Sequence, residues 1–135
     1  MYHFINFLFE HWFLSLNFLI VFFLLIFIEF FDFNSSFSLY YCELVNLMNH
    51  KSIIIVDFRD KNSYLAYHIL GSFNVDLNEI YLFLKKYSKK VIILVCKNGR
   101  ISSKKASVLF KNGYTDIKFL KGGIDFWMKD GYPVN

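Results

Sequence analysis

The chain has little of the residues that typify irregular or cross-linked proteins. Its 135 residues include one proline, six glycines and two cysteines. So little proline and glycine excludes collagen-like and Pro/Gly-rich low-complexity sequence, and two cysteines cannot build a disulfide scaffold. The sequence contains neither a CxxC pair nor a Cys/His cluster at zinc spacing, so we expect no metal site. Disorder is excluded too, because 56% of the residues are hydrophobic and 21% are aromatic.

Basic residues are missing from the first 37 positions. This segment has three acidic residues and no Lys or Arg, whereas residues 38–135 hold all 15 Lys and Arg against eight acids. Phenylalanine is just as uneven, with 12 of its 18 copies before position 38. The chain therefore combines two parts of different composition. We expect an N-terminal segment over residues 1–33, a linker over 34–40 and one folded domain over 41–135.

The N-terminal segment contains a long uncharged run. Residues 12–28 read WFLSLNFLIVFFLLIFI, and extension to residue 31 adds only Glu29 as a charge. A helix needs roughly 20 residues to cross the ~30 Å hydrocarbon core of a bilayer. We therefore predict a transmembrane helix over about residues 12–31, with the lipid bilayer as its partner. Aromatic residues suited to the membrane interface flank the run: Trp12, Phe30, Phe31, Tyr40 and Tyr41.

Two other interpretations of this run stay open. A cleaved secretory signal would need a positively charged start and a small-residue cleavage site, and neither is evident. A buried core helix is weakened because no face of the run is polar. For a membrane helix, the first basic residue is Lys51 and the later sequence is rich in lysine, so the N-terminus is expected outside and the domain in the cytoplasm.

The folded domain shows an alternating pattern. Apolar, β-branched runs predict short buried strands at residues 53–56, 72–75, 91–95 and 117–120. Helical spacing and stop signals predict helices at residues 41–49, 61–67, 77–87 and 102–111, with a last short one around Trp127. Strands that alternate with helices in this way predict an α/β fold, with a mostly parallel sheet and helices on both faces.

One cysteine lies where α/β folds place active sites. Cys96 directly follows the strongest predicted strand and precedes the helix expected from Ser102. The loop N–H groups, the helix N-terminus and the charges of Lys97 and Arg100 would all favour a thiolate over a thiol. Gly99 allows a backbone conformation that other residues resist. The sequence thus indicates a reactive thiolate, and a buried, inert cysteine at a strand end is the alternative.

Several segments resemble the rhodanese family of sulfurtransferases. Similar to family motifs are Cys96–Ser102 (CKNGRIS, the active-site loop), Asp57–Arg59, His68–Asn74, Lys111–Tyr114, and Leu120–Ile124 followed by Trp127 and Gly131–Val134. These motifs occur in the family's order across residues 42–135. The resemblance implies a rhodanese-like fold. The single-pass architecture also resembles YibN-like rhodanese proteins of the bacterial inner membrane, which implies that localisation.

The resemblance implies sulfur transfer. Cys96 would be the nucleophile that takes a sulfur from a thiosulfate-like donor, holds it as a persulfide and passes it to a thiol acceptor. The loop residues Lys97, Asn98, Gly99, Arg100, Ile101 and Ser102 would cradle the anion. No cofactor beyond the covalent persulfide is implied. Asp57, Arg59 and His68 are expected to support the structure, and no motif suggests nucleic-acid binding.

Two departures from the family pattern bear on activity. Ile101 stands where many members have Arg or Thr, and Leu70 replaces the proline of the His68 motif. A non-catalytic module that binds a partner or carries sulfur is therefore an alternative function. A phosphatase or arsenate reductase is a third, but the clamping Arg of cysteine phosphatases is replaced by Ser102. Cys42 is expected to be a buried helix residue, with a resolving thiol or a palmitoylation site as alternatives.

Overall fold

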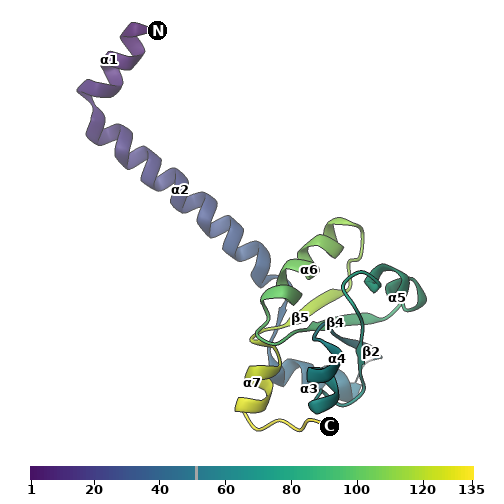
Figure 1. Cartoon of the computed structure of the whole chain (residues 1–135). Helices are drawn as coiled ribbons and strands as arrows, with labels where there is room; N and C mark the ends of the chain where they lie inside the picture. Colours follow the sequence, from purple (N-terminus) through teal and green to yellow (C-terminus); the bar gives the residue numbers. More distant parts are fainter. Residues whose placement is uncertain (51) are drawn as a thin grey trace. The chain divides into compact units, whose positions relative to one another are not determined.

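The structure is a computed structural model of the chain (Figure 1) that describes residues 1–50 and 52–135, and every side chain among these except those of Leu8 and residues 30–35. The chain forms two compact units, Met1–Ser35 and Ser36–Asn135. The interfacial positions predicted for the side chains of Phe30 and Phe31, and the predicted role of Lys51, lie outside the described residues. Each unit is considered separately below.

The first unit consists of two helices. Helix α1 covers Tyr2–Glu10 and α2 covers Trp12–Ser35, with His11 at φ −115° and ψ 36° between them. The stretch Trp12–Glu29 of α2 is long and apolar enough to cross a membrane, and none of it is buried. Length and composition thus make α2 a possible membrane span. The sequence analysis assigned no helix to residues 2–10.

The second unit is built on a five-stranded parallel sheet. In chain order, its elements are β1 (Ser38–Leu39), α3 (Tyr41–His50), β2 (Ile53–Asp57), α4 (Lys61–Ala66), β3 (Ser72–Asn74), α5 (Ile80–Lys86), β4 (Val91–Val95), α6 (Arg100–Lys111), β5 (Ile117–Leu120) and α7 (Gly123–Lys129). The strand order is β1-β5-β4-β2-β3, and every pairing is parallel. This order places β4 at the centre of the sheet, so the segment that follows β4 emerges at its middle (Figure 1).

Successive residues of the strands pack into two separate hydrophobic cores, one on each face of the sheet. Ile54, Val56, Ile92 and Leu94 pack on one face, with residues of α5 and α6 such as Leu84 and Leu109. Ile55, Ile93 and Val95 pack on the other face, with Leu44 of α3 and Trp127 of α7. Side chains point to opposite faces at successive strand positions. Strands covered on both faces must therefore be apolar at every position, which explains the continuous runs IIIV and VIILV.

The predicted parallel α/β sheet with helices on both faces is confirmed, and the differences lie at element boundaries. Helix α6 begins at Arg100 instead of Ser102, because the left-handed Gly99 (φ +85°) starts the helical turn earlier. Helix α5 begins at Ile80, three residues later than expected. Residues 34–40 are not simply a linker, since α2 continues to Ser35 and β1 pairs with β5.

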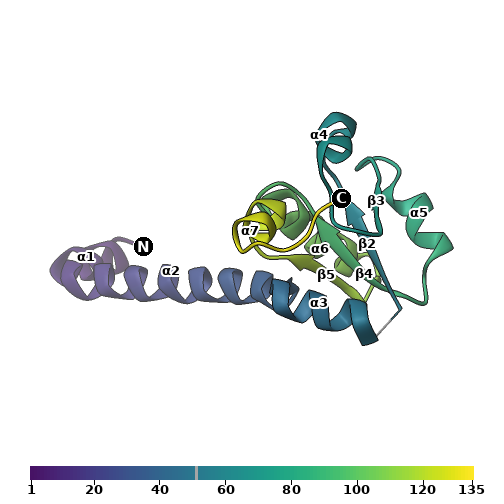
Figure 2. The same cartoon turned by 90° about the horizontal axis from the view of Figure 1, so that it is seen from below.

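The last residue of the sequence is held against the loop after α4. Asn135 N donates to the His68 carbonyl oxygen at 2.8 Å, and His68 N donates to the Asn135 carbonyl oxygen at 3.1 Å. In Figure 2, the C-terminus lies beside α4 at the end of the sheet where β2 finishes. This pairing helps to position the loop that contains His68.

Candidate functional site

The centre of the candidate site is Cys96, at the carboxyl end of the central strand β4. The residue is only 2% exposed. The backbone N–H of Gly99 donates to its Sγ at 3.0 Å. The Ser102 hydroxyl lies 3.3 Å from Sγ and 3.3 Å from the Gly99 carbonyl oxygen. Because this hydroxyl has one hydrogen, it can donate to a thiolate at Sγ or to the carbonyl, but only to one at a time.

The loop after Cys96 depends on glycine at position 99. Gly99 has φ +85°, a left-handed conformation that favours glycine. A Cβ at this position would lie 3.0 Å from the Gly122 nitrogen and 3.2 Å from the Leu120 carbonyl oxygen. These neighbours are backbone atoms at the end of β5. Glycine therefore lets the loop turn tightly enough to aim its N–H at the sulfur while packing on the next strand.

The start of α7 clasps the same loop from the other side. Ile124 N donates to the Cys96 carbonyl oxygen at 3.0 Å, and Asp125 N donates to the Lys97 carbonyl oxygen at 3.1 Å. A Cβ at Gly123, which has φ +61°, would collide with these two carbonyl oxygens. The first N–H groups of a helix have no partner within the helix. Here they fix the backbone of the cysteine loop.

The six residues predicted to cradle an anion differ in their surroundings. Gly99 and Ser102 are buried and contact the sulfur. Lys97, Asn98, Arg100 and Ile101 are exposed. The Asn98 Oδ1 accepts a hydrogen bond from the Arg100 backbone N–H at 3.1 Å. The loop thus has an inner pair that contacts the sulfur and an outer set whose side chains face solvent.

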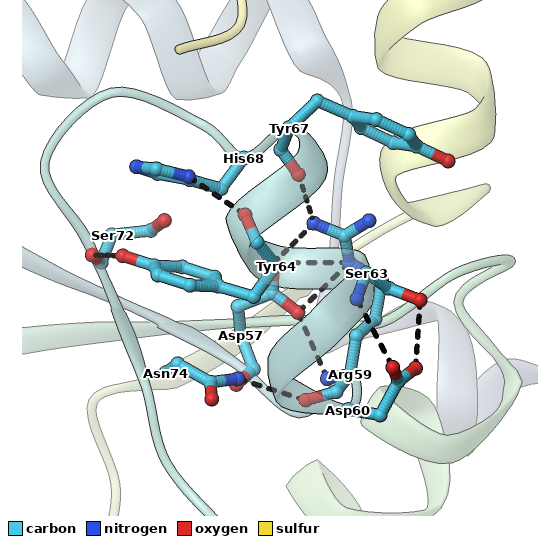
Figure 3. A network of polar contacts seen from close by, with 9 residues as sticks. All are labelled: Asp57, Arg59, Asp60, Ser63, Tyr64, Tyr67, His68, Ser72 and Asn74. Carbon is cyan, nitrogen blue, oxygen red and sulfur yellow. Dashed lines mark hydrogen bonds and ion pairs between the residues drawn. The ribbon is translucent and has the colours of Figure 1, made fainter.

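The predicted supporting residues Asp57 and Arg59 form a buried ion pair beside this loop. The Arg59 Nε and Nη2 donate to the two carboxylate oxygens of Asp57 at 2.9–3.1 Å, and Nη2 also donates to the Tyr67 carbonyl oxygen at 2.6 Å. Figure 3 shows Arg59 between the carboxylate and the Tyr67 backbone. Phe58 N donates to the Val95 carbonyl oxygen at 2.9 Å, so the segment carrying this pair is bonded to the residue before Cys96.

His68 belongs to the same network. Its ring stacks on Tyr64 with 4.1 Å between ring centroids, and its Nδ1 lies 2.9 Å from the Tyr64 carbonyl oxygen (Figure 3). A carbonyl oxygen can only accept, so Nδ1 carries the hydrogen in this contact. His68 therefore ties the end of α4 to the following loop, a structural role.

A cavity of about 570 Å³ lies beside the loop. Its lining comes from the segments that follow β1, β4 and β5, from the start of α3 and from α7 with its C-cap: Tyr40, Tyr41, Asn98, Lys121, Gly122, Phe126, Lys129 and Asp130. The Tyr41 hydroxyl is hydrogen-bonded to the Asp130 carboxylate, and this bond and the nearby negative charge raise the pKa of Tyr41. The sequence analysis missed this cavity as a site, although its residues follow strands of one parallel sheet.

Two further expectations can be compared with the structure. Cys42 lies in α3 as expected but is exposed, so the prediction that it is buried is wrong. It falls on the outward side of the helix, whose buried residue is Leu44. Trp127 is buried in the core, as predicted. Among the described side chains, which leave out those of Leu8, residues 30–35 and residue 51, no three from His, Cys, Asp or Glu are grouped so that they could hold a metal ion.

Comparison with known proteins gives consistent matches for the second unit. The family model described as "Rhodanese-like domain" matches residues 42–130. Thiosulfate sulfurtransferase GlpE of Pseudoalteromonas translucida is 34% identical over 86 residues, covering 63% of this chain and 82% of that protein. The uncharacterized protein YibN of Escherichia coli K12 is 29% identical over 96 residues, covering 68% of this chain and 67% of that protein.

Solved structures agree with the sequence matches. The BH2092 protein from Bacillus halodurans superimposes with a TM-score of 0.66 and 26% identity, covering 79% of this chain and 82% of that protein. The two proteins therefore share a fold.

Proposed function

The chain belongs to the rhodanese-like domain family, whose relatives include thiosulfate sulfurtransferases, and from this premise we propose that it is a membrane-anchored sulfurtransferase with Cys96 as the nucleophile. The observation that carries the proposal is the hydrogen bonding of the Cys96 sulfur by Gly99 and Ser102 at the end of the central strand. Donors aimed at a sulfur stabilise negative charge on it. Thiosulfate, or a donor like it, is the sulfur source.

The proposed reaction has two balanced steps. In the first, the Cys96 thiolate attacks the outer sulfur of thiosulfate; a sulfur–sulfur bond forms, the bond within thiosulfate breaks, and sulfite leaves with its electron pair. In the second, an acceptor thiolate attacks the outer sulfur of the Cys96 persulfide. The sulfur leaves on the acceptor as a new persulfide, and the Cys96 thiolate is regenerated. Neither step needs an external oxidant or reductant.

The loop residues have distinct parts in this proposal. The Gly99 N–H and the Ser102 hydroxyl stabilise the thiolate before attack and after release. The exposed cations Lys97 and Arg100 attract the dianionic donor, an effect on the rate that salt would screen. Ser102, buried and bonded within the loop, also occupies the position where a cysteine phosphatase needs an arginine. The residues at the site therefore fit sulfur transfer better than phosphate hydrolysis.

Mass spectrometry of the full-length protein in a neutral detergent tests the enzyme. After incubation with thiosulfate, we expect wild type to gain one sulfur atom, which dithiothreitol removes. Cys42→Ser is the matched control, since it removes the other cysteine and should still load. Cys96→Ser should not. No adduct on folded wild type, with other sulfane donors also tried, would refute the sulfurtransferase.

A second function is favoured by one observation. Cys96 is 2% exposed, so access of donors and acceptors to the sulfur is narrow. A non-catalytic module that binds a partner at the membrane needs no such access. Failure to load in the experiment above, with the protein folded, would support this alternative.

We further propose that α2 crosses the bacterial inner membrane once and that the second unit faces the cytoplasm. The apolar stretch Trp12–Glu29 and the lysine-rich domain after it support this orientation. Cys42 is the better reporter, because it is exposed whereas Cys96 is buried. In a Cys96→Ser background, a membrane-impermeant maleimide should label Cys42 only after the cells are lysed. Labelling of Cys42 on intact cells would reverse the orientation.

A further inference from the structure

The cavity beside the cysteine loop has a mixed lining of aromatic rings and cations. Three rings, those of Tyr40, Tyr41 and Phe126, contribute to its walls with two lysines, Lys121 and Lys129. The Lys121 Nζ donates to the Tyr40 hydroxyl at 3.1 Å and lies 4.9 Å from the centre of that ring. An ammonium has three donors, so hydrogens remain for a ligand. Such a lining suits a ligand with an apolar body and an acidic group.

The acidic residue of the cavity does not cancel this preference. The Asp130 carboxylate interacts with the Tyr41 hydroxyl and raises the pKa of that group, so part of its charge is directed at Tyr41. The two lysines outnumber it, which leaves the lining with a net positive charge. The exposed Lys97 of the neighbouring loop adds to the positive electrostatic potential at the cavity. The charge complementarity therefore favours an anion.

The cavity is next to the reacting loop and shares Asn98 with it. Asn98 lines the cavity, and its Oδ1 also holds the Arg100 N–H of the loop. Gly122 lines the cavity too, and its nitrogen lies 3.0 Å from the point where a Cβ on Gly99 would be. A ligand bound here would lie against the same loop that surrounds the Cys96 sulfur.

Size distinguishes the two substrates of the proposed reaction. Thiosulfate is a small dianion without an apolar part, so three aromatic rings in a cavity of about 570 Å³ would contribute little to its binding. An acceptor must bring its thiol to the sulfur of Cys96, a residue that is only 2% exposed. If the body of the acceptor binds in the cavity beside the loop, its thiol can extend from there to the Cys96 sulfur.

We propose that this cavity binds the sulfur acceptor, and that the acceptor is a small thiol with an apolar or aromatic body and an acidic group, recognised by Lys121 and Lys129. The inference rests on the proposed sulfurtransferase function and specifies its second substrate. The carboxylate lies near the two ammonium groups, and the apolar body packs on the rings of Tyr40 and Phe126.

Discharge of the isolated persulfide tests this proposal apart from its formation. Full-length protein in neutral detergent is loaded with saturating thiosulfate and desalted, and persulfide loss is followed with 4-mercaptobenzoate or with 4-mercaptobenzyl alcohol, which lacks the carboxylate. Comparing each variant with wild type for the same thiol cancels the intrinsic reactivity of that thiol. The variants are Lys121→Gln/Lys129→Gln and the control Lys118→Gln, an exposed lysine of β5 outside the cavity.

The expected result is selective. The double variant should discharge to 4-mercaptobenzoate on the order of five-fold more slowly, since one exposed charge pair changes an equilibrium roughly two- to five-fold. Its discharge to the alcohol, and both reactions of Lys118→Gln, should stay within about two-fold of wild type by the same reasoning. Benzoate, which has no thiol, should slow discharge to 4-mercaptobenzoate in wild type and not in the double variant.

Two results would overturn the proposal. One is a double variant that discharges to the two thiols at equal fractions of the wild-type rates. The other is an absence of benzoate inhibition in wild type. Both leave the sulfurtransferase intact if Cys96 has loaded, whereas a failure of loading itself refutes the proposed function on which this inference rests.

Discussion

The clasp between α7 and the cysteine loop makes Gly123 the most informative position to perturb. An alanine there would have to adopt φ +61° and would bring its Cβ against the carbonyl oxygens of Cys96 and Lys97. Both atoms are backbone, so no side-chain rotation relieves the clash. The loop must move away from α7, or α7 must shift, and either movement breaks the bonds from Ile124 N and Asp125 N.

The expected magnitude combines two effects. Holding an alanine in the left-handed region costs about 1–2 kcal/mol, and losing two backbone hydrogen bonds costs about 1 kcal/mol each. Gly123→Ala should thus lower the free energy of unfolding of the second unit by about 3–4 kcal/mol. Gly131→Ala is the matched control: its φ is +77° but nothing lies within 4 Å of its Cβ position, so only the backbone cost applies.

Thermal unfolding and sulfur loading read out the two consequences. In a Trp12→Phe background, the fluorescence of Trp127, buried in the core, reports the second unit alone. For a domain of this size 1 kcal/mol shifts Tm by roughly 4–8 °C, so Gly123→Ala should melt at least ~8 °C below Gly131→Ala. It should also load sulfur more slowly at a temperature where both are folded. Equal Tm and equal loading for the two variants would refute the proposed role of the hydrogen bonds between α7 and the cysteine loop.

Three more predictions concern other described residues. Asp57→Asn should lower the free energy of unfolding by about 3–5 kcal/mol, because it leaves the Arg59 guanidinium buried without its charge partner. Thermal melting measures this change. A decrease in stability no larger than that of a substitution at an exposed residue would contradict the role of the ion pair. The side-chain and backbone hydrogen bonds from Ser63 hold the pKa of Asp60 below its ordinary value of 3.8. The ionised cap therefore stabilises the folded state at pH values above 3.8, and this stabilisation is lost as the pH falls through the lowered pKa. The Tm difference between wild type and Asp60→Ala should thus be present at pH 6 and shrink towards pH 2, and a difference independent of pH would refute this. Ile101→Arg adds a cation at a half-exposed position in the first turn of α6 and should speed loading by thiosulfate at low salt, with the gain lost at high salt. A gain insensitive to salt would exclude electrostatic attraction.

The strands that organise the domain could be predicted because their signal is local. Residues 91–95 are apolar without a break, and only a strand covered on both faces explains such a short run. The position of Cys96 at the end of that strand followed directly. The short strand β1 could not be found in this way, because two residues carry no periodicity and its pairing partner Phe119 lies 81 positions away from Ser38.

The parts of the site that depend on three-dimensional contact were not predictable from the pattern. The cavity joins residues from positions 40 to 130, and nothing in the local sequence marks Tyr40 or Phe126 as neighbours. The exposure of Cys42 is an exception, because helical spacing already places it on one side of α3 with Asn46 and Asn49, four and seven residues further on, which are also exposed. The Gly122-Gly123 pair was visible, but its contact with the Cys96 carbonyl oxygen became apparent only in the fold.

The covering of the central strands on both faces has a consequence for how this sequence can change over generations. At each position of β2 and β4 except Asp57, which pairs with Arg59, the neighbours require an apolar side chain of suitable volume. Exchanges between Ile and Leu there conserve volume and usually cost less than about 1.5 kcal/mol, so such substitutions can accumulate in the strands. Gly99 of the cysteine loop and Gly123 of α7 have no such substitutes. Among the buried positions of this domain, we therefore expect the strands to change within the apolar class and Gly99 and Gly123 to keep their identity, because at these glycines the backbone itself makes the contact.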